Sequence, residues 1–73
     1  MDAKTLEFTI KTCLKEMRGR LEQAAGIAKA AEACADAGSI EKGIEVALDI
    51  EQLVYEVNTF LNAASMMYRI LKS

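Results

Sequence analysis

Apolar residues in the second half of the chain recur in steps of three and four, which follow one face of an α-helix. One such series contains no charged residue: Ile40, Gly43, Ala47, Ile50, Val54, Val57, Leu61, Ala64, Tyr68 and Leu71. A column beside it is also wholly apolar: Val46, Leu53, Phe60 and Met67. The pattern predicts one helix over residues 40–72, with an apolar stripe wide enough for more than one neighbouring helix.

The first half carries a less regular stripe of the same kind. Its seam is Leu6, Ile10, Cys13, Met17, Arg20, Ala24, Ile27, Ala31 and Cys34, flanked by Leu14, Leu21, Ala28 and Ala35. Gly19 and Gly26 interrupt this segment, and each costs about 1 kcal/mol relative to alanine inside a helix. The pattern predicts a helix over residues 2–37 that begins at Asp2. A kink near Gly19, which would give three helices in all, is the alternative.

A turn separates the two segments at residues 38–39. Gly38 suits the left-handed conformation that ends a helix, and Ser39 can accept a hydrogen bond from the first amides of the next one. Glu41 then lies favourably in the first turn of the second helix. Such a short connection forces antiparallel neighbours. We therefore expect one all-α domain over residues 1–73, folded as an antiparallel helical hairpin.

A hairpin of two helices covers only part of the wide stripe, and so small a core is marginal on its own. Two hairpins packed into a four-helix bundle would cover the rest. We expect a homodimer whose interface comprises Val46, Leu53, Val54, Val57, Phe60, Leu61 and Met67. Residues 4–20 hold five bases and two acids, whereas residues 32–56 hold seven acids and one base. This charge gradient favours a head-to-tail dimer.

The amino-acid composition excludes several classes of function. The 73 residues are 52% apolar and 27% charged, and they contain neither proline nor histidine. Without histidine, imidazole acid/base chemistry and Glu-x-x-His metal sites are excluded. An acidic ridge of Glu41, Glu45, Asp49 and Glu56 is better explained as a solvated face than as a cation site. We expect no enzyme activity, no catalytic residue, no cofactor and no metal site.

The apolar runs are far shorter than the roughly 18 residues of a membrane span, and the N-terminus lacks the pattern of a signal peptide. Cys13 and Cys34 are 21 residues apart, which is about 31 Å along one helix, so they cannot pair within it. The apolar runs, the N-terminus and the cysteine spacing together lead us to expect a cytoplasmic protein.

Four apolar residues fall outside the predicted seam: Leu48, Tyr55, Met66 and Ile70. They either close the bundle or form a face for a helical partner. Four bases near one side of the first helix, Lys4, Lys11, Lys15 and Arg18, are the minimum for touching phosphates. The net charge of −2 argues against nucleic acid.

In outline the chain resembles two families of small helical proteins. Its length, its single turn and the early pair Leu6-Glu7 are similar to the co-chaperones of type III secretion needle subunits, which implies a larger helical partner. Its size and hairpin architecture are similar to the Rop-type plasmid regulators, which implies binding to paired RNA loops. The residues themselves favour a non-enzymatic protein-protein interaction or regulatory module that acts as a homodimer.

Overall fold

The computed structural model describes residues 2–73 and begins its first helix where the sequence predicts. Asp2 has an extended backbone, and its carboxylate accepts a hydrogen bond of 2.7 Å from the amide of Thr5. This bond to the first free amides of the helix lowers the pKa of Asp2 below its ordinary value. Helix α1 then extends over Ala3–Asp36.

Helix α1 is uninterrupted through Gly19 and Gly26, so the alternative of a kink near Gly19 is wrong. Two ion pairs, each between residues one helical turn apart, span Gly19. Arg20 binds Glu16 at 2.7 Å, and Arg18 binds Glu22 at 2.6 Å. Pairs at this spacing stabilise helices and here help to offset the low helix propensity of glycine.

The turn forms as the sequence predicts. Gly38 has a φ of 98°, in the left-handed region. The Gly38 amide donates to the carbonyl of Ala35, and the Ser39 amide donates to the carbonyl of Cys34, both at 3.0 Å. This pair of bonds is the Schellman ending of a helix. The Ser39 hydroxyl accepts a long hydrogen bond of 3.4 Å from the Lys42 amide and so caps the next helix.

The predicted single helix over residues 40–72 is divided in two. Helix α2 extends over Ile40–Ala47 and helix α3 over Ile50–Lys72. Between them, the amide of Asp49 donates to Val46 and that of Glu51 to Leu48, three residues back instead of four. Both linking residues, Leu48 and Asp49, keep right-handed helical dihedrals. The interruption is therefore a local tightening of the helical ladder, which needs neither glycine nor proline.

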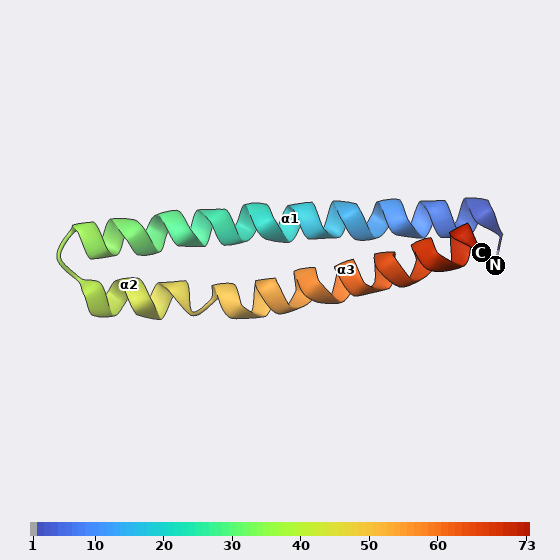
Figure 1. Cartoon of the computed structure of the whole chain (residues 1–73). Helices are drawn as coiled ribbons and strands as arrows, with labels where there is room; N and C mark the ends of the chain where they lie inside the picture. The colour runs from blue at the N-terminus through green and yellow to red at the C-terminus, as the bar shows by residue number, and fades with distance from the viewer. Residues whose placement is uncertain (1) are drawn as a thin grey trace.

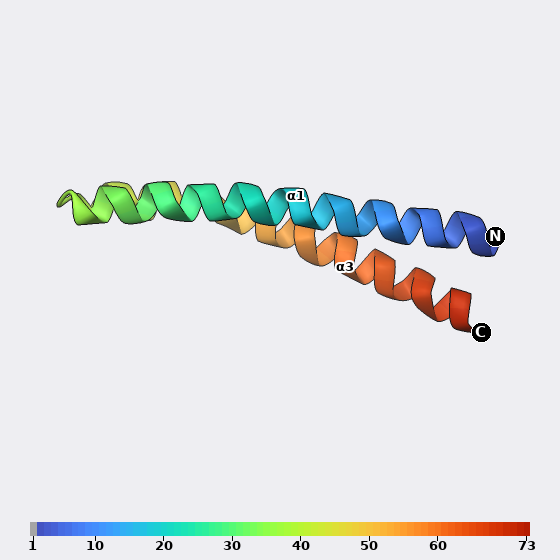
Figure 2. The same cartoon turned by 90° about the horizontal axis from the view of Figure 1, so that it is seen from above.

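The three helices form an elongated antiparallel hairpin of 54 × 14 × 12 Å (Figure 1). This confirms the all-α hairpin. Figure 2 shows α2 behind α1, whereas α3 diverges from α1 towards the C-terminus. Within residues 2–73, no helix combines the length and the hydropathy that crossing a membrane requires.

Helices α1 and α2 are in close contact at Gly43. A β-carbon built on Gly43 would lie 2.9 Å from the carbonyl oxygen of Ala31 and 3.4 Å from the β-carbon of Ala35. Only a residue without a side chain fits against this backbone. Within residues 2–73 the buried apolar side chains are few: Leu6, Cys13, Ala31 and Ala64.

The predicted seam of the first helix is confirmed, because each of its residues is buried or half-buried. In the second half of the chain, the column predicted as a flank turns inward. Phe60 lies under the guanidinium of Arg20, which is 4.7 Å from the ring centroid. Val46, Leu53 and Met67 share its side of the hairpin, seven residues apart, and all are half-buried. The outward column is instead Ile40, Ala47, Val54, Leu61 and Tyr68, of which Ala47 alone is half-buried.

Candidate functional site

The hairpin has two unlike flanks, one on each side of the line where its helices meet. Glu16 in α1 and Glu56 in α3 both reach Arg20, so they lie on the same flank. Each glutamate comes one position before a half-buried residue that faces the other helix, Met17 or Val57. Leu21 and Val54 instead come one position after such a residue. One position is a rotation of about 100° around the helix, so Leu21 and Val54 are turned away from the line of contact in the direction opposite to the glutamates. They therefore share the opposite flank.

The polar flank is organised by Arg20, whose side chain is 26% exposed. Its Nε donates to Glu56 at 2.8 Å, and its Nη1 donates to Glu16 at 2.7 Å. These bonds raise the pKa of Arg20 above its ordinary value. Hydrogen bonds from Gln52, at 3.0 Å, and from Arg20 lower the pKa of Glu56. The ring of Phe60 covers one face of the guanidinium, so this charge is partnered within the chain.

The opposite flank, called the apolar flank below, carries large hydrophobic side chains that project into solvent. It consists of Leu14, Leu21, Ile40, Val54, Leu61 and Tyr68. Leu21 is 51% exposed and Val54 is 53% exposed. Together these six are half of the large hydrophobic residues that the described chain exposes. Large exposed apolar patches are typical of interaction surfaces in general, which makes this flank the candidate site.

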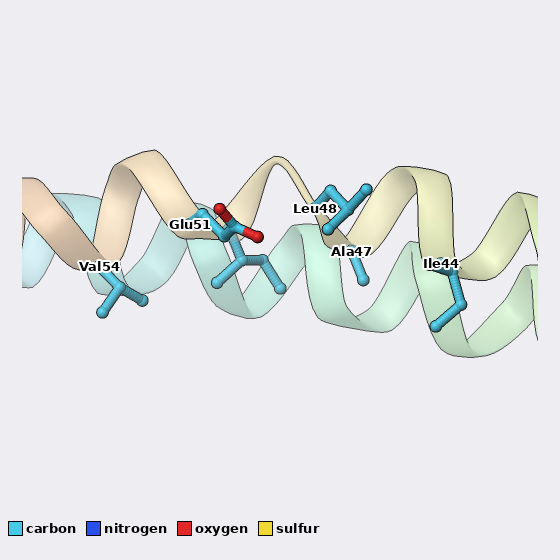
Figure 3. Close-up of a pocket in the computed structure, with 6 residues that line it drawn as sticks. Ile44, Ala47, Leu48, Glu51 and Val54 are labelled. Atoms are coloured by element: carbon cyan, nitrogen blue, oxygen red, sulfur yellow. The ribbon is translucent and has the colours of Figure 1, made fainter.

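A hollow lies beside Val54 of the apolar flank, where α2 meets α3. The hollow has a volume of about 440 Å³. Its lining is Ile44, Ala47, Leu48, Ile50, Glu51 and Val54. Figure 3 shows Ile44, Ala47 and Val54 pointing to the same side of the chain, with the short side chain of Ala47 between the two longer ones. Five of the six lining residues are apolar, so the hollow suits an apolar side chain.

A second hollow, of about 390 Å³, lies on the polar flank. Its lining is Lys15, Glu16, Arg18, Gly19, Arg20, Gln23 and Glu56. Arg20 is held there by Glu16 and Glu56, so its charge is already neutralised. Among residues 2–73, no three acidic or cysteine side chains come close enough to hold a metal ion. The two thiols, Cys13 and Cys34, are free.

The residues predicted for the dimer interface fall into two groups. Val46, Leu53, Val57, Phe60 and Met67 are half-buried within the hairpin. Val54 and Leu61 are exposed and belong to the apolar flank. The interface itself stays a prediction, and the structure offers two of its seven residues to a partner without rearrangement.

The four candidate partner residues are all exposed, but they do not form one patch. Leu48 and Tyr55 are seven residues apart on the outer side of the chain, and Leu48 also borders the hollow. Met66 and Ile70 are one turn apart near the C-terminus. Of the candidate phosphate contacts, Arg18 is paired with Glu22, which removes one of the four bases from that face.

The sequence did not reveal the partners of Arg20 or the hollow at the α2–α3 junction. For the partners of Arg20, the available signal was a charged residue inside an apolar seam, since a buried charge requires partners. No signal marked the hollow, because the helical pattern is unbroken at Leu48 and Asp49.

The amount of exposed surface is the final feature. The chain exposes 5464 Å², whereas a folded monomer of 8.0 kDa typically exposes roughly 4,500 Å². The excess is about 1,000 Å², and a stable protein interface removes about 800 Å² from each partner. The exposed surface of the hairpin is therefore large enough to supply one such interface.

Comparisons with protein-family models, with curated proteins and with solved structures find no match to this chain. A proposal about its function rests on the geometry above.

Proposed function

We propose that this chain is a small non-enzymatic protein-protein interaction module of the cytoplasm that works as a homodimeric four-helix bundle. The observation that carries the proposal is the apolar flank, a row of large hydrophobic side chains with no covering element in the hairpin. Exposing it in water is unfavourable by about 25 cal/mol for each Å². A second hairpin is the simplest cover, and it would complete the bundle.

The contrast with the polar flank supports an interaction function over a catalytic one. Arg20, Glu16 and Glu56 satisfy one another, which leaves no poised acid, base or nucleophile in this cluster. The hollow on the other flank is lined by aliphatic side chains and one exposed glutamate, Glu51. Its chemistry suits shape recognition.

The test is the mass in solution, measured by light scattering on a sizing column over a wide dilution range. We expect twice the chain mass of 8.0 kDa, and retention of that mass well below micromolar concentration. A mass of one chain at every concentration would refute the homodimer. In that case the apolar flank would await a different partner, as the resemblance to secretion co-chaperones implies.

A second candidate, capture of a larger helical protein, is favoured by the exposure of Tyr55 and Leu48 on the outer side of the chain. A dimer that uses the apolar flank leaves Tyr55 free. Tyr55→Asp should then abolish capture of such a partner without changing the mass of the dimer. An RNA or DNA role would instead require binding that weakens steeply with salt and is lost in Lys11→Glu with Lys15→Glu.

A further inference from the structure

The apolar flank is built in layers, each with one residue from α1 and one from the antiparallel α2 or α3. The register is fixed by Arg20 opposite Glu56 and by Gly43 packed between Ala31 and Ala35. Steps of seven residues from these contacts give the layers of the flank. From the open end towards the turn, they are Leu14 with Leu61, Leu21 with Val54, and Ala28 with Ala47.

The side chains of these layers become smaller from the open end towards the turn. The layer of Leu21 and Val54 is in the middle. One layer towards the open end there are two leucines, and one layer towards the turn there are two alanines. Beyond them, Tyr68 stands near the open end and Ile40 near the turn, at similar distances from the centre. The flank is therefore complementary in size to itself after end-to-end reversal.

We infer that the occupant of the apolar flank is a second copy of this chain, docked head to tail, with its Leu61 seated in the hollow around Ala47. The inference rests on the proposed homodimer and specifies its face, orientation and register. The two-fold axis passes through the layer of Leu21 and Val54, so that each of these residues meets its own copy. Leu14 of each chain then packs on Ala28 of the other.

The shape of the hollow fits a leucine from a facing helix. In helix packing, a protruding side chain enters a hole formed by four residues of its neighbour, at helical spacings of three, four and seven. Ile44, Ala47, Leu48 and Glu51 have this spacing and line the hollow. Ala47 has the smallest side chain of the four, which leaves room for the incoming leucine.

Charge supports the same orientation. Lys11 borders the apolar flank near the open end, and Glu32 borders it near the turn. Reversal about Leu21 brings Lys11 of one chain close to Glu32 of the other. The reverse alternative, turn beside turn, would bring together the two acidic segments over residues 32–56, which hold seven acids each. It would also stack four alanines in one layer and leave a void.

Cross-linking tests the orientation. Cys13→Ala and Cys34→Ala first remove the native thiols, and light scattering and circular dichroism confirm that this background stays dimeric and helical. In the background, Leu21→Cys should cross-link to its own copy with a short bis-maleimide. Leu14→Cys should not cross-link alone, but should do so when mixed with Ala28→Cys.

The outcome for a turn-beside-turn dimer is opposite. There Leu21→Cys would link only to Val54→Cys in a mixture of the two variants, and not to itself. That result would overturn the inference. A dimer in which none of these positions cross-links would also overturn it, because the interface would lie elsewhere, although the proposed homodimer would stand. A monomeric parent protein would instead refute the homodimer on which the inference rests.

An exchange of side-chain sizes tests the seating of Leu61. Ala47→Leu fills the hollow, so in a head-to-tail dimer it should raise the dissociation constant on the order of tenfold or more. Adding Leu61→Ala in the same chain should restore most of the lost affinity, because the larger side chain now comes from the other side. In a turn-beside-turn dimer, Ala47→Leu would fill the alanine void and strengthen the dimer. Tighter association of Ala47→Leu would therefore contradict the proposed register.

Discussion

The two flanks of the hairpin can be compared at one level of α1, where the inward side chain of Arg20 reaches the carboxylates of the polar flank and the next residue, Leu21, lies on the apolar flank. On the polar side, the guanidinium has two carboxylates and an aromatic ring within reach. On the apolar side, Leu21 and Val54 are about half exposed. The chain thus completes its polar contacts internally and leaves its apolar surface open. The apolar flank is therefore the surface to which we assign the proposed partner.

The polar flank also explains why the apolar one is available. Arg20 is part of the inward seam of α1, and its guanidinium stacks on Phe60. This contact requires the column of Phe60 to face inward, and the column of Val54 then faces outward. Our hypothesis is that the charged cluster favours this side of α3 against α1, which is a specificity role more than a source of stability.

The largest expected effect comes from placing a charge in the centre of the apolar flank. In the proposed dimer, Val54→Asp would put two carboxylates face to face at the two-fold axis, where water would be excluded. The dissociation constant should rise on the order of 100-fold or more, since each 1.4 kcal/mol is about tenfold. Sedimentation equilibrium measures it.

Asn62→Asp is the control for that change. It adds the same charge to the same helix at an exposed position one residue after Leu61, on the outer side of the bundle. It should leave the mass of the dimer unchanged. Equal affinity of the Val54→Asp and parent proteins would show that the apolar flank is not the interface.

The second prediction concerns the distance between α1 and α2 at Gly43. Gly43→Ala puts a β-carbon 2.9 Å from the carbonyl oxygen of Ala31, and this backbone atom cannot move aside alone. The free energy of unfolding should fall by about 1 to 3 kcal/mol, as measured by urea denaturation at saturating dimer concentration.

Gly26→Ala is a matched control inside α1, because nothing lies within 4 Å of its new β-carbon. It should raise the free energy of unfolding by up to about 1 kcal/mol through higher helix propensity. If the two alanines shifted stability in the same direction, the close approach at Gly43 would not limit the packing.

Sequence patterns predicted the hairpin and its turn, because capping, left-handed glycine and helical periodicity are local properties. They also predicted the inward seam of α1, where one stripe is clearly the most apolar. For the second half of the chain the pattern contains three neighbouring apolar columns, and neither of the outer two contains a charged residue. The choice between Phe60 and Leu61 as inward residues depends on Arg20 across the hairpin, a tertiary contact. The tightening at Leu48 and Asp49 has no local signal either.

The third prediction breaks the polar flank. Arg20→Ala removes two ion pairs and the contact with Phe60, so the midpoint of thermal unfolding should fall, by less than in Gly43→Ala. Arg18→Ala removes an ion pair of the same spacing whose side chains are about two-thirds exposed. That change should lower the free energy of unfolding by no more than about 0.5 kcal/mol. A comparable loss in the two variants would mean that the cluster around Arg20 is no more than a surface ion pair.

The smallest effect is the dependence of the polar flank on pH. Hydrogen bonds from Gln52 and Arg20 lower the pKa of Glu56 in the folded chain. Its contribution to stability is therefore complete above the ordinary pKa of glutamate, and it is lost as the pH falls below that pKa and through the lowered one. Glu56→Gln cannot ionise and lacks this contribution at every pH. The parent should thus be more stable than Glu56→Gln at pH 7, and the difference should shrink towards zero in acid. Urea denaturation of both proteins from pH 7 downwards measures it, with Asp2 and the other carboxylates common to the pair. A difference that stays constant with pH would show that Glu56 acts by packing, without a role for its charge.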